Sequence, residues 1–167
     1  VKNVIDSYQN KCLGKKTLVF NINIEHSKEV CNEFVMAGYD AQYLDSTFNI
    51  DERLSVLQWF EDTSNAILCN VDILTTGFDE PSIESIIVNR STTSLPLWLQ
   101  MTGRGGRLYP GKVFFTIIDL GDNLDTHGRW EEKRDWREEF DLKENLGVAP
   151  IKDCPDCGFM NNSTTKE

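Results

Sequence analysis

The chain has 167 residues, of which 40% are hydrophobic and 26% charged, and its net charge is -10. These values predict one globular domain with a core and room for a short appendage. The negative charge argues against a protein that coats DNA non-specifically, because neutralising phosphates is the main source of that affinity. No apolar run is long enough to span a bilayer, and no signal-peptide pattern opens the chain, which favours the cytoplasm. Because the chain starts at Val1 and ends in a polar tail, we expect a fragment of a longer protein.

Short apolar runs alternate with longer amphipathic segments. The run at 17–22 is continuous and rich in β-branched and aromatic residues, as expected of a strand buried on both faces. Strands alternating with helices indicate an α/β fold in which helices cover both faces of a parallel sheet. We expect strands at 17–22, 41–44, 66–69, 85–88 and 113–118, and helices at 1–14, 27–37, 95–101 and 129–145.

A further helix is expected after Asn49. Asn49 followed by Glu52 is typical of a capping box, in which each side chain binds the other residue's backbone N–H. Leu54, Leu57 and Phe60 would form the apolar face of this helix.

Residues 100–107 place Arg104 and Arg107 among three glycines, directly after the predicted helix 95–101. Arginine binds phosphate oxygens through two parallel hydrogen bonds and keeps its charge, while glycine lets a helix end and a ligand approach the backbone. Two interpretations stay open. The arginines either meet an anionic ligand or cap the last carbonyls of the helix.

Small polar residues gather where the predicted strands end. In an open parallel sheet, ligands bind beyond the carboxyl ends of the strands. Residues 23–27, 45–47, 71–81 and 89–94 leave those ends. The arginine segment follows a helix instead, so we expect it on the rim.

The five cysteines fall into two groups. Three are scattered in apolar runs and are expected to be buried thiols: Cys12, Cys31 and Cys69. Cys154 and Cys157 have the spacing of half a tetrahedral zinc site, but no second pair follows. The pair is either part of a truncated zinc ribbon or idle.

Three segments have the order and spacing of known motifs. Residues 17–27 look like motif IV, residues 71–81 like motif V, and residues 100–107 match the Gln-x-x-Gly-Arg-x-x-Arg form of motif VI. Together they resemble the second RecA-like domain of superfamily 2 helicases and translocases. The likeness covers about 15–120 and is closest to the phage and bacterial branch similar to XPB-type and restriction-enzyme-type DNA translocases.

The resemblance implies a RecA-like, three-layer α/β/α domain at 1–124. A charged helical extension would follow at 125–150, and the tail at 151–167 would hold the cysteine pair. Five residues beyond 118 also look like the tail of that branch: Asp119, Asn123, His127, Gly128 and Trp130.

For the nucleotide, the resemblance implies that Arg104 and Arg107 are arginine fingers, which supply fixed positive charge to phosphoryl transfer. It also implies that Gln100, Gly77 and Asp79 lie near the nucleotide. Asp79 could instead be a turn or helix-capping residue, and Gln100 a surface residue of its helix.

For the nucleic acid, the resemblance implies backbone contacts by Asn23, His26, Thr75, Thr76 and Arg90. The two threonines could instead form turns, and His26 could cap or pack against a helix. Thr76 departs from the glutamate common in this branch, and residues 44–46 depart from the usual His-Gly. Arg53 is interpreted as structural.

The sequence has no phosphate-binding loop and no acidic magnesium box. The resemblance therefore implies that ATP and Mg²⁺ are held mainly by a first RecA-like domain of the full-length chain. The full-length protein would be an ATP-dependent helicase, while this fragment alone would be inactive. DNA rather than RNA is the expected partner, and no membrane partner is expected. The alternative is a non-catalytic RecA-like module that binds protein or nucleic acid.

Overall fold

The computed structural model describes residues 2–71, 74, 78–137, 151–153 and 160–162. The chain divides into two compact units, Val1–Trp130 and Glu131–Glu167. Each is described by itself. Among the described residues, no helix is long and apolar enough to cross a membrane.

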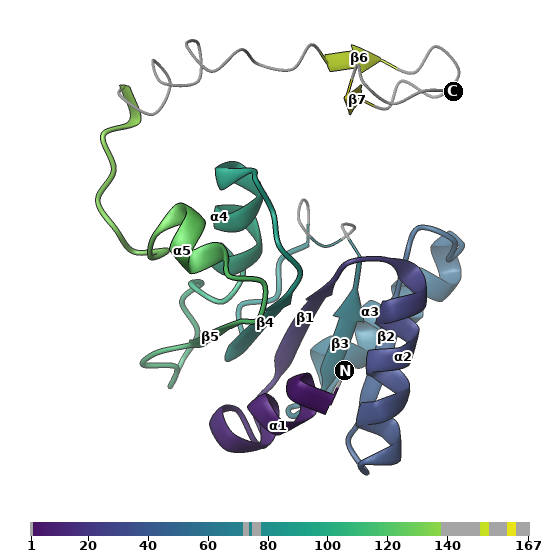
Figure 1. Cartoon of the computed structure of the whole chain (residues 1–167). Coiled ribbons are helices and arrows are strands. Elements are labelled where there is room, and N and C mark those ends of the chain that lie inside the picture. The colour runs from purple at the N-terminus through teal and green to yellow at the C-terminus, as the bar shows by residue number, and fades with distance from the viewer. Residues whose placement is uncertain (1, 72–73, 75–77, 138–150, 154–159, 163–167) are drawn as a thin grey trace. The chain divides into compact units, whose positions relative to one another are not determined.

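The first unit is built on a sheet of five parallel strands in the order β2-β3-β1-β4-β5 (Figure 1). The central strand β1 is buried along its whole length, and its Thr17 lies between Ile67 and Ser85. The predicted parallel α/β sheet is therefore confirmed. The strands are β1 Thr17–Asn21, β2 Ala41–Leu44, β3 Ile67–Asn70, β4 Ser85–Asn89 and β5 Thr116–Asp119.

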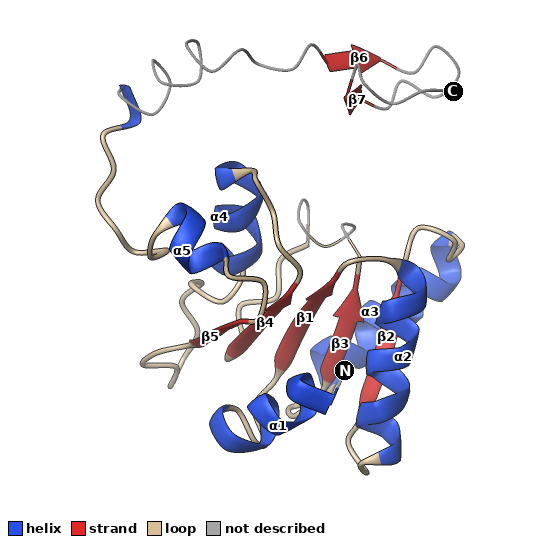
Figure 2. Ribbon diagram, in the orientation of Figure 1, coloured by secondary structure: helices blue, strands red, loops and turns tan. Residues whose placement is uncertain are grey.

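Helices cover both faces of this sheet (Figure 2). The helices α1 (Lys2–Lys11) and α2 (Ile24–Met36) pack on one face around Tyr8 and Phe34. The helices α3 (Ile50–Asp62) and α4 (Leu95–Gly103) pack on the other face around Phe60 and Trp98. The short helix α5 (Asn123–His127) follows β5. This is the predicted three-layer α/β/α arrangement.

Within the first unit, the starts of α2 and β5 differ most from the prediction. Helix α2 begins at Ile24, not near Ser27, because the Asn23 side chain caps it by accepting the His26 backbone N–H at 2.8 Å. Strand β5 begins at Thr116, since Val113 and Phe114 precede it with 92% and 69% of their surface exposed.

The capping box at the start of α3 is confirmed. The Glu52 N–H donates to Asn49 Oδ1 at 2.9 Å, and the Asn49 N–H donates to Glu52 Oε2 at 3.0 Å. The predicted apolar face is partly wrong, because Leu54 is 60% exposed while Val56 is buried beside Phe60. Capping depends on local spacing, whereas the buried face depends on where the sheet lies.

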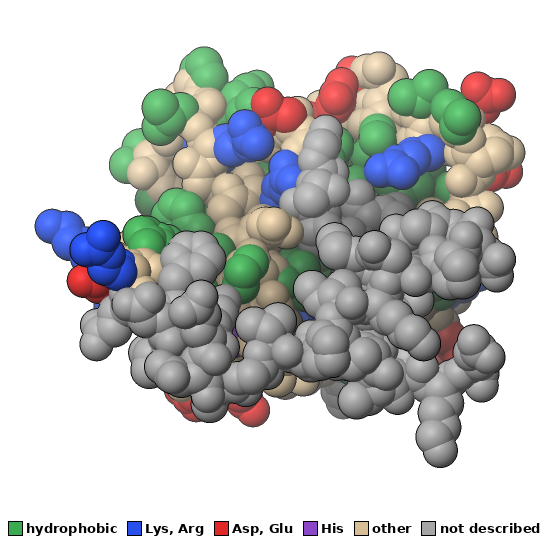
Figure 3. All heavy atoms as spheres, turned by 90° about the horizontal axis from the view of Figure 1, so that it is seen from above, with side chains coloured by type: hydrophobic (Ala, Val, Ile, Leu, Met, Phe, Trp, Pro, Cys, Tyr) green, Lys and Arg blue, Asp and Glu red, His purple; other side chains and the backbone are tan. Residues whose placement is uncertain are grey.

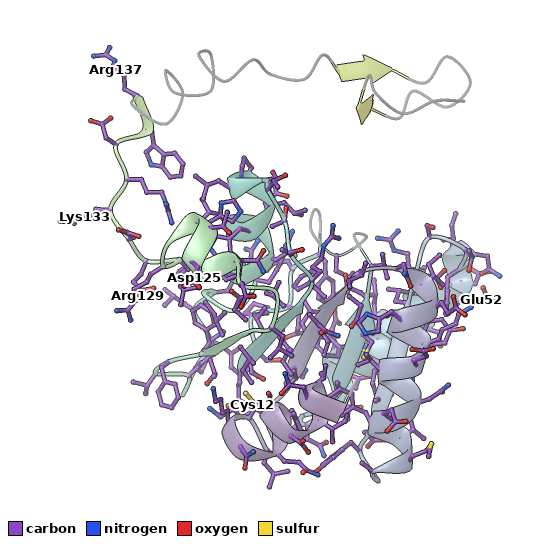
Figure 4. All side chains as sticks on the ribbon, viewed as in Figure 1. Cys12, Glu52, Asp125, Arg129, Lys133 and Arg137 are labelled. Atoms are coloured by element: carbon purple, nitrogen blue, oxygen red, sulfur yellow. The ribbon has the colours of Figure 1, made fainter. Side chains whose placement is uncertain are left out.

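The three cysteines of the first unit are free and buried, as predicted. Burial raises the pKa of the Cys12 and Cys69 thiols. Figure 4 shows Cys12 beyond the end of α1 and Glu52 at the start of α3.

The C-terminal region differs from the predicted helix at 129–145. Residues 129–135 form turns and coil, a helical segment starts at Trp136, and 138–150 lie outside the described residues. A hairpin that the sequence did not predict pairs β6 (Ile151–Asp153) with β7 (Met160–Asn162) in antiparallel fashion. Cys154 and Cys157, between these strands, lie outside the described residues, so zinc binding stays a prediction, as do the predicted domain bounds.

Candidate nucleotide and nucleic-acid sites

The predicted arginine turn forms at the end of α4. Ser94 starts this helix by accepting the Leu97 backbone N–H, and Trp98 anchors it in the core. Arg104 is the C-terminal capping residue of α4, and Gln100 lies on its exposed side. The helix therefore delivers both arginines to a short turn that starts where α4 ends.

The two arginines of this turn meet residues of the predicted motif V. Arg104 Nη1 donates to the Phe78 carbonyl oxygen. Arg107 Nε lies 3.1 Å from Asp79 Oδ1, with 46% of the arginine and 62% of the aspartate side chain exposed. The structure thus joins two segments that are more than twenty residues apart in sequence, and the Asp79 side chain does more than form a turn.

Electrostatics distinguishes the two guanidiniums. Burial lowers the pKa of Arg104, the positive charge of Arg107 lowers it further, and Asp79 raises it. An arginine guanidinium is not deprotonated in proteins, so Arg104 keeps its charge. The Arg107–Asp79 pair is exposed, and pairs of this kind contribute at most about 1 kcal/mol. Arg107 can therefore exchange its carboxylate for another anion at low cost.

An open hollow of about 340 Å³ adjoins Asp79 between motif V and α3. Arg53, on the first turns of α3, lines this hollow together with Asp79 and Phe78. Arg53 was interpreted as structural because the helicase family that the sequence resembles usually carries a largely structural arginine on this helix. The hollow adds a third arginine to the surroundings of Asp79.

Gly77, Thr75 and Thr76 lie outside the described residues, so their predicted roles stay predictions. The other candidates for nucleic-acid contact gather at the carboxyl ends of β1 and β4. Asn89, at the end of β4, donates to Asn21 Oδ1 at 3.0 Å and lies 3.4 Å from His26 Nε2. Asn23 caps the neighbouring helix.

The structure shows capping and packing contacts of His26, while its predicted contact with nucleic acid stays a prediction. Its backbone N–H completes the α2 cap, and its ring contacts Asn89. Its Nδ1 atom is buried without a hydrogen-bond partner among the described residues. A buried polar atom of this kind is uncommon, so the ring retains hydrogen-bonding capacity beyond its packing role.

Residues beyond β5 hold the segment that contains Arg90. Asn123, which is almost fully buried, donates to the Arg90 carbonyl oxygen and accepts the Thr92 N–H at 2.8 Å. His127 Nε2 lies 2.7 Å from the Thr92 carbonyl oxygen. The sequence placed Asn123 and His127 in the tail of the resemblance without a role, and the structure shows what they support.

Positive and negative side chains are mixed on the face of the molecule that Figure 3 shows. Seen from above in Figure 3, the Lys and Arg side chains of the described residues form separate groups among Asp and Glu side chains, not one continuous basic patch. The chain as a whole carries a net charge of -10.

Two glycines of the arginine turn are required by packing. A Cβ at Gly105 would lie 2.2 Å from the Phe115 ring, and one at Gly106 would lie 2.7 Å from the Trp130 ring. Neither glycine has a positive φ. The sequence suggested freedom for the backbone, whereas the structure shows two aromatic rings packed directly against it.

We expect Gly105→Ala to destabilise the first unit by about 1–3 kcal/mol, because the Phe115 ring must move to admit the methyl group. The matched control is Gly103→Ala, whose Cβ would meet its nearest atom at an ordinary 3.5 Å. The free energy of unfolding in urea measures both. Equal stability of the two variants would contradict the assigned packing.

Comparisons with known proteins agree with the fold of the first unit. The family described as "Helicase conserved C-terminal domain" matches residues 2–109. The chain belongs to this family. Its architecture is that of the second RecA-like domain of superfamily 2 helicases, which confirms the predicted resemblance.

Two curated relatives show the range of this similarity. A "51.5 kDa protein" of Lactococcus phage (isolate 7-9) is 32% identical over 94% of this chain and 35% of its own length. The "Putative mitochondrial ATP-dependent helicase irc3" of Schizosaccharomyces pombe is 44% identical over 65% of this chain and 18% of its own length. The chain therefore spans about a third or less of these relatives.

Among solved structures, the C-terminal domain of the DEAD-box protein Dbp5 matches with a TM-score of 0.64, covering 86% of this chain and 89% of that one. The two sequences are 15% identical, so this likeness concerns the fold alone. The matched fold is nearly the whole of a helicase C-terminal domain.

Proposed function

We propose that this chain is the second motor domain of an ATP-dependent nucleic-acid helicase or translocase. In this proposal it supplies Arg104 and Arg107 to an ATP site that is shared with a first RecA-like domain of the full-length protein. The observation that carries the proposal is the meeting of both arginines with Phe78 and Asp79 in a domain of the helicase family. Gln100, Gly77 and Asp79 would lie on the nucleotide side.

The residues of the turn fit an anionic ligand. Bound ATP with Mg²⁺, held mainly by the first domain, would supply the γ-phosphoryl group that is transferred to water. Arg104 is fixed by its bond to the Phe78 carbonyl and keeps its charge, whereas Arg107 is exposed and forms a weak pair with Asp79. The Arg104 guanidinium is thus preorganised, whereas the Arg107 guanidinium can move onto a phosphate oxygen.

For the nucleic acid, we propose the carboxyl edge of the sheet, with Asn23, His26 and Arg90 joined by Thr75 and Thr76. The amide and imidazole groups at this edge are suited to hydrogen bonds with phosphate oxygens, which position a strand without reading its sequence. We propose DNA rather than RNA, on the resemblance of motifs IV to VI to DNA translocases. The proposed setting is the cytoplasm of a bacterial or phage-infected cell.

The ATPase activity of the full-length protein tests this proposal. We expect hydrolysis that DNA stimulates more strongly than RNA, and no measurable hydrolysis by the 167-residue chain alone. A full-length protein that binds nucleic acid but hydrolyses no ATP, with or without DNA or RNA, would favour the alternative of a non-catalytic binding module.

A further inference from the structure

One lysine joins the two segments that carry the arginine site. The Lys112 ammonium donates to the carbonyl oxygens of Pro81 at 2.5 Å, Ile83 at 3.0 Å and Gly105 at 3.1 Å. An ammonium group has three N–H donors, and here each has an acceptor. The Pro81 carbonyl lies at the end of motif V and the Ile83 carbonyl just beyond it, whereas Gly105 directly follows Arg104 in motif VI.

Local sequence explains how Lys112 reaches this position. Residues 109–112 form a turn closed by the Lys112 N–H donating to the Tyr109 carbonyl at 3.0 Å. Pro110 and Gly111 occupy the middle of the turn, and Gly111 has a φ of 82°, a conformation that favours glycine. The turn reverses the chain just beyond the arginines, so Lys112 folds back onto the arginine turn at Gly105.

The segment that Lys112 binds is itself ordered by a carboxylate. Glu80 Oε1 accepts the backbone N–H of Ser82 at 2.9 Å and also bonds its hydroxyl. Glu80 is almost fully buried, so this short turn has little freedom. Lys112 therefore attaches the arginine turn to a rigid support next to Asp79.

Lys112 is partly buried from solvent. Burial lowers the pKa of Lys112, and the nearby carboxylates of Glu84 and Glu80 raise it. Charge-assisted hydrogen bonds in such a place are stronger than those between neutral groups. A neutral side chain at this position would leave three carbonyl oxygens without their donor.

We infer that Lys112 is a positioning residue for the two arginines: its ammonium sets the distance between the motif V segment and the motif VI turn. In this inference Lys112 does not contact ATP. It acts by positioning Arg104 and Arg107. The inference rests on the proposed function, in which these arginines serve ATP hydrolysis. It adds a residue outside motifs IV, V and VI to the machinery of the site.

The test compares Lys112→Met with Lys15→Met in the full-length protein. Methionine keeps the unbranched side chain up to the ε position and removes the ammonium group with its charge and donors. Lys15 is also half-buried, but it contacts Thr116 and the Phe114 ring, not the arginine turn. We expect Lys112→Met to lower the kcat of ATP hydrolysis about 10- to 100-fold with the KM for ATP changed less than about twofold, because misplacing a transition-state group by about 1 Å costs this much. Lys15→Met should leave both constants unchanged.

Hydrogen–deuterium exchange of the same full-length variants gives a readout independent of activity. Lys112→Met should speed exchange of the backbone amides in peptides covering 79–84 and 103–108, and Lys15→Met should not. Unchanged exchange there would overturn the inference, even if the wild-type protein proved to have no ATPase activity. Faster exchange with an undiminished kcat in an active enzyme would overturn it as well.

Discussion

Replacing Arg107 by alanine should lower the nucleic-acid-stimulated kcat of the full-length protein by about 10³-fold or more, with little change in its stability. The effect is large because a guanidinium that serves as an arginine finger contributes about 10³ to 10⁵ in rate. The stability change is small because Arg107 is half-exposed and its pair with Asp79 is worth at most about 1 kcal/mol. Steady-state ATP hydrolysis and urea unfolding measure the two quantities on one protein sample.

The matched control for this prediction is Lys11→Ala. Lys11 is an exposed cation in the last turn of α1, a helix that covers the opposite face of the sheet from α4. Both variants lose one positive charge, so a general electrostatic effect on nucleic-acid binding would lower kcat in both. Undiminished turnover in Arg107→Ala, or an equal loss of kcat in Lys11→Ala, would show that Arg107 is not part of the proposed site.

Replacing Trp98 by alanine should destabilise the first unit by about 3–5 kcal/mol, because it removes the largest fully buried side chain and leaves a cavity. Trp98 is 1% exposed, and its Nε1 donates to the Gly128 carbonyl at 3.2 Å. It therefore holds α4 both on the core and on the chain after α5. The free energy of unfolding in urea gives the size of the loss.

Two further variants test how far the loss depends on burial. Trp98→Phe keeps much of the buried ring and should lose less than the alanine variant. Trp136→Ala, at a tryptophan that is 53% exposed, should change stability by less than about 1 kcal/mol. A Trp98→Ala protein as stable as Trp136→Ala would show that α4 does not depend on this anchor.

Much of the fold could be predicted because its signals are local. A strand buried on both faces needs a short continuous apolar run, and β1 has one at Thr17–Asn21. The Asn49–Glu52 capping box depends on a spacing of three residues, and the structure confirms it. The starts of two elements were predicted wrongly: α2 begins at Ile24 after its Asn23 cap and not near Ser27, and Val113 and Phe114 look like a strand but lie exposed before β5.

Only some of the residues of the candidate site could be predicted. Motif order indicated that Arg104, Arg107 and Asp79 belong to one site, and the structure brings them together. No sequence pattern indicates that Arg53 lines the same hollow or that Asn123 supports the Arg90 segment. These contacts join residues from different elements, and neither periodicity nor spacing carries that information.

The sequence by itself determined the apolar runs that form the strands and the capping box of α3, since each depends on residues a few positions apart. The tertiary structure alone decided the partners of the site. It packs Phe115 against Gly105 and Trp130 against Gly106, and it brings Lys112 to carbonyl oxygens up to 31 residues away in sequence. The physical reason is that strand order and helix packing, which form only when the whole sheet assembles, set which distant groups meet.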